Sequence, residues 1–194
     1  MRKAVFLDRD GVLIGHPKDT YKGYVYEESH IAVLPGVAEA LGEMKARGYL
    51  LFVVSNQSTI ADGYATPEKV AQLHEFLNKK LGNLIDKFYI CPHHPKPRAD
   101  VPEWAQEYRI DCDCRKPAPG MLLRATKDFD VSLEESWLVG DMISDIAAGK
   151  AAGCKTIMVE SAHSGKIITT AKPLDVNVRA DAYVKTLQEA LAFL

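Results

Sequence analysis

The chain has 194 residues, of which 26 are acidic and 24 are lysine or arginine, and its formal net charge is −2. This length fits a single domain, residues 1–194, and the near balance of charge excludes the strongly basic class of nucleic-acid and acidic-membrane binders. No apolar stretch approaches the roughly 20 residues of a transmembrane helix, and the basic start precedes only a short apolar run, so we expect no signal peptide. These observations predict a cytoplasmic protein.

An apolar run at residues 4–7 is followed directly by two aspartates, Asp8 and Asp10. The run is typical of a buried parallel strand. Residues i and i+2 of a strand face the same side, so both carboxylates should leave its C-terminal end together, where open α/β sheets bind ligands. Asp-x-Asp-Gly also occurs in calcium loops and in ordinary turns, and this motif alone leaves those alternatives open. The pair requires a cation, and suggests one carboxylate as nucleophile and the other as acid and base.

Predicted strands and helices then alternate, apart from the weakly periodic residues 11–34 and the irregular residues 91–117. The strands are expected at 50–54, 88–90, 136–139, 154–159 and 182–184. The helices are expected at 35–47, 66–80, 119–128, 143–152 and from 186 onward. Strict alternation of this kind predicts an α/β fold of three layers, a Rossmann-like parallel sheet with helices on both faces.

Polar residues follow the second predicted strand and precede the helix at 119–128. Ser55 and Asn56 offer a hydroxyl and neighbouring backbone N–H groups that suit a phosphoryl oxygen, although such residues also favour turns and caps. Arg115 and Lys116 are, taken alone, equally typical of a solvated pair. Their place beside a segment that we expect to be pinned by metal favours a functional role.

Asp141 follows the strand at 136–139, and Asp145 lies one helical turn further on the same face. Capping of the helix is the alternative role of Asp141. A carboxylate that attacks a phosphate dianion meets about 8 kcal/mol of repulsion at about 4 Å and an effective dielectric constant near 20. Mg²⁺ on oxygen ligands offsets this repulsion, and a lysine neutralises the charge that spreads over the phosphoryl oxygens. These parts are supplied by Asp8, Asp10, Lys116 and Asp141.

The irregular segment carries two close pairs of metal-binding side chains, namely Cys91 with His93 and Cys112 with Cys114. Three thiolates and one imidazole form the closed tetrahedral set that is typical of structural zinc. His93 is preferred to His94, because its i, i+2 relation to Cys91 puts both side chains on one side of an extended segment. Four unrelated residues remain the alternative. Zinc would clamp a loop of about 25 residues that lacks a core of its own.

Four motifs follow one another in the order Asp8-Arg9-Asp10-Gly11, a strand ending in Ser55, Lys116, and Gly140-Asp141 with Asp145. In this order they resemble the haloacid-dehalogenase-like phosphohydrolases, over essentially the whole chain. The resemblance implies that Asp8 is the nucleophile that forms an aspartyl-phosphate, and that Asp10 is the general acid and later the base. It implies that Ser55 and Lys116 hold the phosphoryl group, that Asp145 steers Asp141 or the lysine, and that Mg²⁺ is held by Asp8, the backbone carbonyl of Asp10, and Asp141.

The cysteine pairs with Arg115-Lys116-Pro117 narrow the resemblance to the zinc-containing histidinol-phosphate and heptose-bisphosphate phosphatases. This subfamily has no large cap domain, and by similarity Arg115 and Asn56 would contact the substrate. The run 119–123 favours the heptose branch. Asp62 and Met142 depart from that branch, as does the segment 161–180, and a negative charge at Asp62 would disfavour a second phosphate nearby.

The resemblance and the residues together predict a Mg²⁺-dependent, monomeric phosphatase of a small phosphorylated metabolite, a heptose bisphosphate foremost. Histidinol phosphate is the alternative substrate, and a phosphotransferase is a third possibility. From another class, the chain would be a zinc-clamped protein that binds a phosphometabolite without catalysis. The intact set of aspartates and lysine argues against that last alternative.

Overall fold

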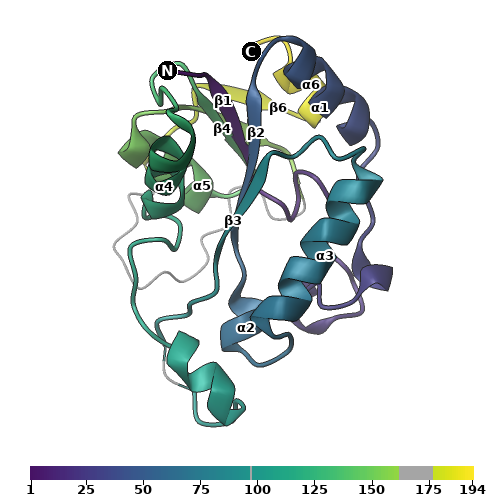
Figure 1. The fold of residues 1–194 in the computed structure, drawn as a ribbon, viewed down its shortest axis with the longest axis vertical. Coiled ribbons are helices and arrows are strands. Elements are labelled where there is room, and N and C mark those ends of the chain that lie inside the picture. The colour runs from purple at the N-terminus through teal and green to yellow at the C-terminus, as the bar shows by residue number, and fades with distance from the viewer. Residues whose placement is uncertain (97, 162–176) are drawn as a thin grey trace.

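The computed structural model describes residues 1–96, 98–161 and 177–194. Six strands form one parallel sheet in the order β3-β2-β1-β4-β5-β6 (Figure 1). Their bounds are Ala4–Leu7 for β1, Leu50–Asn56 for β2, Lys87–Cys91 for β3, Trp137–Gly140 for β4, Lys155–Val159 for β5 and Ala182–Val184 for β6. The predicted α/β class with a parallel sheet is therefore confirmed.

Helices cover both faces of this sheet (Figure 1). The α-helices are α1 at Val37–Ala46, α2 at Ser58–Ala61, α3 at Pro67–Lys80, α4 at Gly120–Phe129, α5 at Ile143–Ala152 and α6 at Leu187–Ala190. Short 3₁₀ helices are η1 at Tyr21–Gly23, η2 at Glu28–His30 and η3 at Glu103–Tyr108.

The buried strands divide their side chains between two cores, as the period of two requires. Val5 and Leu7 of β1 point into the core shared with α1, α3 and α6, whereas Ala4 and Phe6 point into the core shared with α4 and α5. All four side chains are fully buried. The three-layer arrangement predicted from the alternation is thus confirmed.

The described structure differs from the expected elements mainly between β3 and α4. The sequence predicted no regular structure at 91–117, but η3 forms there and packs against α2, with Ala105 buried. Between β1 and α1 and between β3 and α4, the described residues contain only loops and 3₁₀ helices, so these parts hold no large cap domain. No helix among the described residues is long and apolar enough to cross a membrane.

Parallel pairing brings the C-terminal ends of the central strands to one edge of the sheet. Ser55 and Asn56 close β2, Cys91 closes β3, and Asp8 and Asp141 directly follow β1 and β4. The backbone N–H of Asp8 donates to the carbonyl of Val139, 2.9 Å away, which fixes the first aspartate to the neighbouring strand. The fold therefore gathers side chains that lie far apart in the sequence.

Candidate active site

Three buried carboxylates and one buried lysine meet at this edge. Carboxylate oxygens of Asp8, Asp141 and Asp145 lie within 4.8 Å of one another. Lys116 Nζ lies 2.8 Å from Asp8 Oδ1 and 2.6 Å from Asp145 Oδ1, and it donates to the carbonyl oxygen of Val54 at 2.7 Å. The ammonium group is therefore shared between two acids and the end of β2.

Burial and charge compete in this cluster. Burial disfavours the ammonium of Lys116, but the carboxylates of Asp145 and Asp8 outweigh burial and raise the pKa of Lys116. Burial raises the pKa of Asp8 to about 7, with help from the carboxylates of Asp145, Asp141 and Asp10 and against the attraction of Lys116. The cluster therefore has more negative charge than its lysine can neutralise.

The excess of negative charge in the carboxylate cluster and one carboxylate oxygen without a hydrogen-bond partner fit a divalent cation. When all three carboxylates are ionised, their charges and that of the one lysine sum to −2. Asp141 Oδ2 accepts a hydrogen bond from Ser161 at 2.6 Å, whereas its Oδ1 is buried with no hydrogen-bond partner among the described residues. A Cβ at Gly11 would collide with Asp141 Oδ2, so the glycine leaves the space that this carboxylate occupies. Hard oxygen ligands of this kind suit Mg²⁺.

Asp10 is held from outside the carboxylate cluster. Arg9 Nη2 lies 3.0 Å from its carboxylate, and Gln57 Nε2 donates to Asp10 Oδ2 at 3.4 Å. Arg9 is itself buried and lies 3.2 Å, Nη1 to Nε2, from the buried His74. Because a guanidinium can only donate, Nε2 of His74 accepts and the imidazole is neutral with its proton on Nδ1. Burial, reinforced by Arg9, lowers the pKa of His74 to about 3.

The residues at the end of β2 and directly after it lie beside the carboxylate cluster and support Lys116. Gln57 Nε2 donates to Ser55 Oγ at 2.8 Å, so the Ser55 hydroxyl keeps its own proton for another acceptor. The side chain of Asn56 accepts from Lys116 N at 3.0 Å and donates to Lys116 O at 3.1 Å. Its amide group therefore holds the backbone of the lysine, and Asn56 also lines the pocket that contains Asp8.

Arg115 connects His93, one of the predicted zinc ligands, with Ser58 at the start of α2. Its Nη1 donates to Ser58 Oγ and to His93 O, both at 2.9 Å, while its Nε is buried without a hydrogen-bond partner among the described residues. A fixed guanidinium whose buried Nε–H is unused is suited to an incoming oxygen anion.

Cys91, His93, Cys112 and Cys114 form one tight group. The Sγ atoms of Cys112 and Cys114 lie 3.4 Å apart, and those of Cys91 and Cys112 lie 3.6 Å apart. His93 Nδ1 lies 3.4 Å from Cys114 Sγ and 3.7 Å from Cys91 Sγ. Ligands of a tetrahedral zinc ion at bond lengths of about 2.3 Å for sulfur and about 2.0 Å for nitrogen lie about 3.5–3.8 Å apart. The geometry therefore fits zinc.

His94 is placed differently from His93. Its Nδ1 accepts from the backbone N–H of Lys96 at 3.3 Å and lies 3.3 Å from Arg109 Nη2.

Hydrogen bonds from Cys91 first, and then from His93 and Cys112, outweigh burial and lower the pKa of Cys114 to about 5. A thiol that ionises this readily is already close to the thiolate form in which it binds metal.

Asp62, whose charge we expected to disfavour a second phosphate, is buried and paired with cations. Its side chain is only 2% exposed, and Lys22 Nζ and Arg109 Nη1 lie 3.2 and 2.7 Å from its oxygens. Burial alone would raise its pKa, but hydrogen bonds from Tyr24, Arg109 and Lys22 outweigh burial and lower it. The charge is neutralised inside the protein because the loops around it bring cations that the local sequence motif does not contain.

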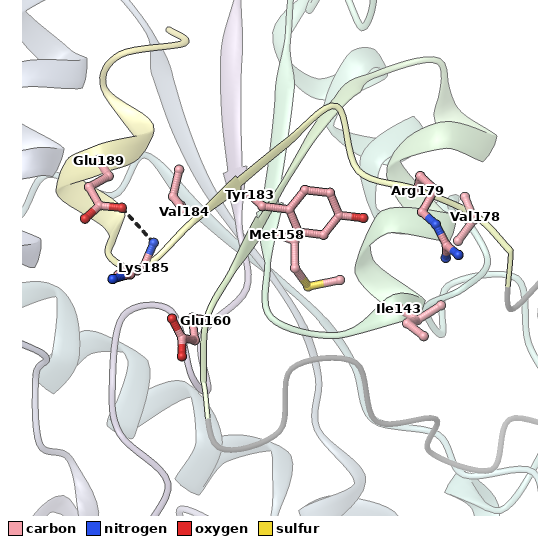
Figure 2. A pocket seen from close by; sticks show the side chains of 9 residues that line it. All are labelled: Ile143, Met158, Glu160, Val178, Arg179, Tyr183, Val184, Lys185 and Glu189. Carbon is pink, nitrogen blue, oxygen red and sulfur yellow. Dashed lines mark hydrogen bonds between the residues drawn. The ribbon is translucent and has the colours of Figure 1, made fainter.

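A pocket of about 470 Å³ joins the carboxylate cluster to these outer residues. Asp8, Asp141 and Lys116 line its inner end, and Lys22 and Lys96 also line it. A larger pocket of about 740 Å³ lies beside β5, β6 and α6, where Figure 2 shows the ring of Tyr183 next to Met158. That pocket contains none of the residues of the carboxylate cluster.

Sequence reasoning missed several residues whose side chains hold the predicted site residues in place. Arg9 lies between the two aspartates of the motif, and strand alternation could have indicated that it points away from them. Gln57 stands one residue after the predicted pair Ser55 and Asn56. No local signal connects His74 or His16 to the site, since both reach it through tertiary contacts with Arg9 and Asp141 respectively.

Comparison with known proteins agrees with this geometry. A family model described as HAD-hydrolase-like matches residues 113–190. The D-glycero-beta-D-manno-heptose-1,7-bisphosphate 7-phosphatase of Pasteurella multocida is 44% identical over 174 residues, which cover 87% of this chain and 86% of the relative. The protein of the same name from Escherichia coli K12 is 38% identical and covers 86% of this chain and 82% of the relative.

A solved structure shares the fold over nearly its full length. The D,D-heptose 1,7-bisphosphate phosphatase of B. bronchiseptica, complexed with magnesium and phosphate, matches with a TM-score of 0.76 at 26% identity and covers 98% of both chains. The fold and the buried acid–lysine cluster thus define a phosphohydrolase of the haloacid-dehalogenase-like class, whose phosphatases use Mg²⁺. Within that class, the chain belongs to the family of the D-glycero-beta-D-manno-heptose-1,7-bisphosphate 7-phosphatases. The resemblance predicted from the sequence is confirmed.

Proposed function

We propose that the protein removes the 7-phosphate of D-glycero-beta-D-manno-heptose 1,7-bisphosphate. The substrate is taken from the relatives of 44% and 38% identity that bear this name. The observation that carries the chemistry is the buried Lys116, which holds Asp8 at 2.8 Å beside an unpartnered oxygen of Asp141. Such a site presents a fixed carboxylate to a phosphoryl group while offsetting the repulsion between them.

Asp8 is the proposed nucleophile and Asp10 the proposed acid and base. A carboxylate oxygen of Asp8 forms a bond to phosphorus as the ester P–O bond breaks, and Asp10 gives its proton to the leaving sugar oxygen. Asp10 then takes a proton from the water that attacks the aspartyl-phosphate, so phosphate leaves and both carboxyl groups return to their starting states. Arg9 and Gln57 hold Asp10 for these two transfers.

Ser55, Lys116 and Arg115 are the proposed contacts to the phosphoryl oxygens. The Ser55 hydroxyl and the buried Arg115 Nε each have a donor that the described residues leave unused. Asn56 has a supporting role, since its amide holds the backbone of Lys116 on both sides. We propose Asp8, the backbone carbonyl of Asp10, and Asp141 as the ligands of Mg²⁺, which when bound would neutralise charge on the phosphoryl group.

Cys91, His93, Cys112 and Cys114 are the proposed ligands of a structural zinc ion within a zinc loop of about 91–117. Lys116 lies two residues after Cys114, so a clamp at the thiols fixes the lysine in the site. We further propose a monomeric protein of one domain in the cytoplasm. All described groups of the site come from one chain, and a thiol cluster of this kind favours a reducing compartment.

Measurement of released phosphate tests the proposal. We expect the purified protein with Mg²⁺ to convert the heptose 1,7-bisphosphate into the 1-phosphate, and a chelator to abolish this turnover. Histidinol phosphate, tested in the same assay, should be a poorer substrate. No phosphate release from any phosphomonoester with Mg²⁺ would contradict the proposed hydrolase, and faster turnover of histidinol phosphate would contradict the proposed substrate.

A further inference from the structure

Asp62 joins three segments that surround the outer part of the pocket. It follows α2, and its Oδ2 accepts from Tyr24 Oη at 2.8 Å and from Lys22 Nζ at 3.2 Å. Its Oδ1 accepts from Arg109 Nη1 at 2.7 Å, and Arg109 Nη1 also donates to the carbonyl oxygen of Ala61 at 3.1 Å. One buried carboxylate therefore connects the loop before α1 with the segment after η3.

The charge around this carboxylate is positive overall. Besides Lys22 and Arg109, Arg98 Nη1 lies 3.8 Å from Asp62 Oδ1. Arg98 pairs more closely with Asp100, since its Nε lies 2.6 Å from Asp100 Oδ1. Three cations therefore face two anions, and the outer wall keeps a surplus of one positive charge. Asp62 therefore holds these cations in place without neutralising all of their charge.

Lys22 is the cation of this group that remains able to bind a ligand. Its side chain is 49% exposed and lines the same pocket as Asp8 and Lys116. An ammonium group has three N–H donors, and Asp62 takes one of them. Arg109 is committed instead to Asp62, to Ala61 O and to Lys96 O, and its side chain is only 4% exposed.

The backbone of Lys22 shows that its position is imposed by its surroundings. Lys22 has φ 54° and ψ 19°, in the left-handed region that non-glycine residues rarely adopt. The flanking Tyr21 stacks on Tyr64 with ring centroids 5.3 Å apart, and Tyr24 meets Tyr64 edge-on at 5.9 Å. A backbone outlier persists only where neighbours hold it, and it is a common mark of functional positions.

We propose that Asp62 is a positioning residue that holds Lys22 at the mouth of the pocket, where Lys22 selects substrates with a second anionic group away from the reacting phosphate. The inference rests on the proposed function, because it assumes that a phosphate ester enters this pocket. It also reverses the expected effect of Asp62: the acid supports recognition of a second anion through the lysine that it fixes.

Paired kinetics with the heptose 1,7-bisphosphate and the heptose 7-phosphate test this selection. Lys22→Met should raise KM for the bisphosphate about tenfold, with kcat and the KM of the monophosphate unchanged within about twofold. Lys22→Arg should restore the bisphosphate KM. Lys18→Met, an exposed lysine of the same loop that does not line the pocket, is the matched control and should behave as wild type.

Asp62→Asn tests the positioning role. Alone, it should lower the preference for the bisphosphate, whereas in the Lys22→Met background it should lower that preference no further. A bisphosphate KM that is unchanged in Lys22→Met would overturn the role of Lys22. A preference that Asp62→Asn leaves intact, or lowers equally in both backgrounds, would overturn the role of Asp62.

Binding to the Asp8→Asn variant separates this inference from the phosphatase itself. Calorimetry with the two sugar phosphates needs no turnover, and it should show tighter binding of the bisphosphate that Lys22→Met removes. Equal affinities for the two ligands would refute the inference even if the enzyme hydrolyses both. A preserved difference that depends on Lys22 would support it even if no turnover were found.

Discussion

Lys116 Nζ lies 2.6 Å from Asp145 Oδ1, and the two side chains are 2% and 1% exposed. Asp145 also accepts from the backbone N–H of Met142 through Oδ2 at 2.9 Å, which fixes it at the start of α5. The carboxylate therefore couples the position of α5 to Lys116, which lies in the segment between β3 and α4. Of the two targets that the resemblance left open for Asp145, the described contacts favour the lysine.

Asp145→Asn should lower kcat about 10- to 100-fold, because a lysine released from one of its two acids loses its alignment with the phosphoryl group. KM for the heptose bisphosphate should change little, since the outer contacts remain. Steady-state kinetics measure both values. Asp130→Asn, at a position whose side chain is 80% exposed, is the control and should retain full activity. A kcat within about twofold of wild type for Asp145→Asn would show that Asp8 and Val54 suffice to hold the lysine.

Asp8→Asn should abolish turnover, with kcat lowered at least about 10³-fold, since an amide does not act as the nucleophile. The fold should persist, because the amide keeps the shape of the side chain and Lys116 still has Asp145 as partner. Phosphate release and thermal unfolding together check both statements. Asp19→Asn, an exposed acid of the loop before α1, should leave both unchanged. Retained turnover in Asp8→Asn would assign the nucleophile elsewhere.

The proposed zinc site should be needed for the order of Lys116 more than for the order of the sheet. Cys112→Ser removes one thiolate of the four-ligand group, so we expect loss of bound zinc in metal analysis and faster hydrogen exchange at residues 112–118. Activity should fall about tenfold or more, because Lys116 lies within this segment. The strands should keep slow exchange, since their cores do not depend on the metal.

Cys154→Ala is the matched control for this prediction. Cys154 is buried against the core on the α4 and α5 side and does not belong to the cysteine–histidine cluster. Its substitution should therefore leave the zinc content at the wild-type level. An unchanged zinc content in Cys112→Ser would refute the proposed site.

The sequence could predict which edge of the sheet gathers the candidate site residues, because that edge depends on the strands alone. Asp8, Ser55 and Asp141 each follow or end an apolar strand, and parallel pairing places all such ends together whatever the intervening loops do. Lys116 lies outside any strand, so it was indicated by its place beside the cysteine pair and by the charge that phosphoryl transfer requires, and the resemblance then added its role. Its contact with Asp8 spans 108 residues of sequence.

The surroundings of Asp62 and Asp10 could not be predicted in the same way. The sign of the charge at Asp62 was evident, but its effect depends on Arg109 and Lys22, which are 47 and 40 residues away. The support of Arg9 by His74 likewise crosses 65 residues. Hydrogen bonds between loops and helix faces have no periodicity, so tertiary structure alone reveals them.

His74 should make the stability of the protein depend on pH below neutrality. Burial lowers its pKa from 6.5 to about 3, so between these values the unfolded chain binds a proton that the folded chain does not. Stability therefore falls as pH drops through this range, and from pH 7 to pH 5 the loss due to His74 is about 2 kcal/mol. His74→Gln keeps an acceptor for Arg9 but does not titrate, so its free energy of unfolding should fall by about 2 kcal/mol less over the same interval.

Urea unfolding at pH 7, 6 and 5 measures this difference. The comparison uses the change between pH values within each variant, so a constant loss of packing in His74→Gln does not affect it. His30→Gln, at a partly exposed position outside the core, should keep the slope of the wild type. Parallel pH profiles for wild type and His74→Gln would mean that the folded protein accommodates a charged His74 beside Arg9, against the neutral, accepting imidazole that their 3.2 Å contact requires.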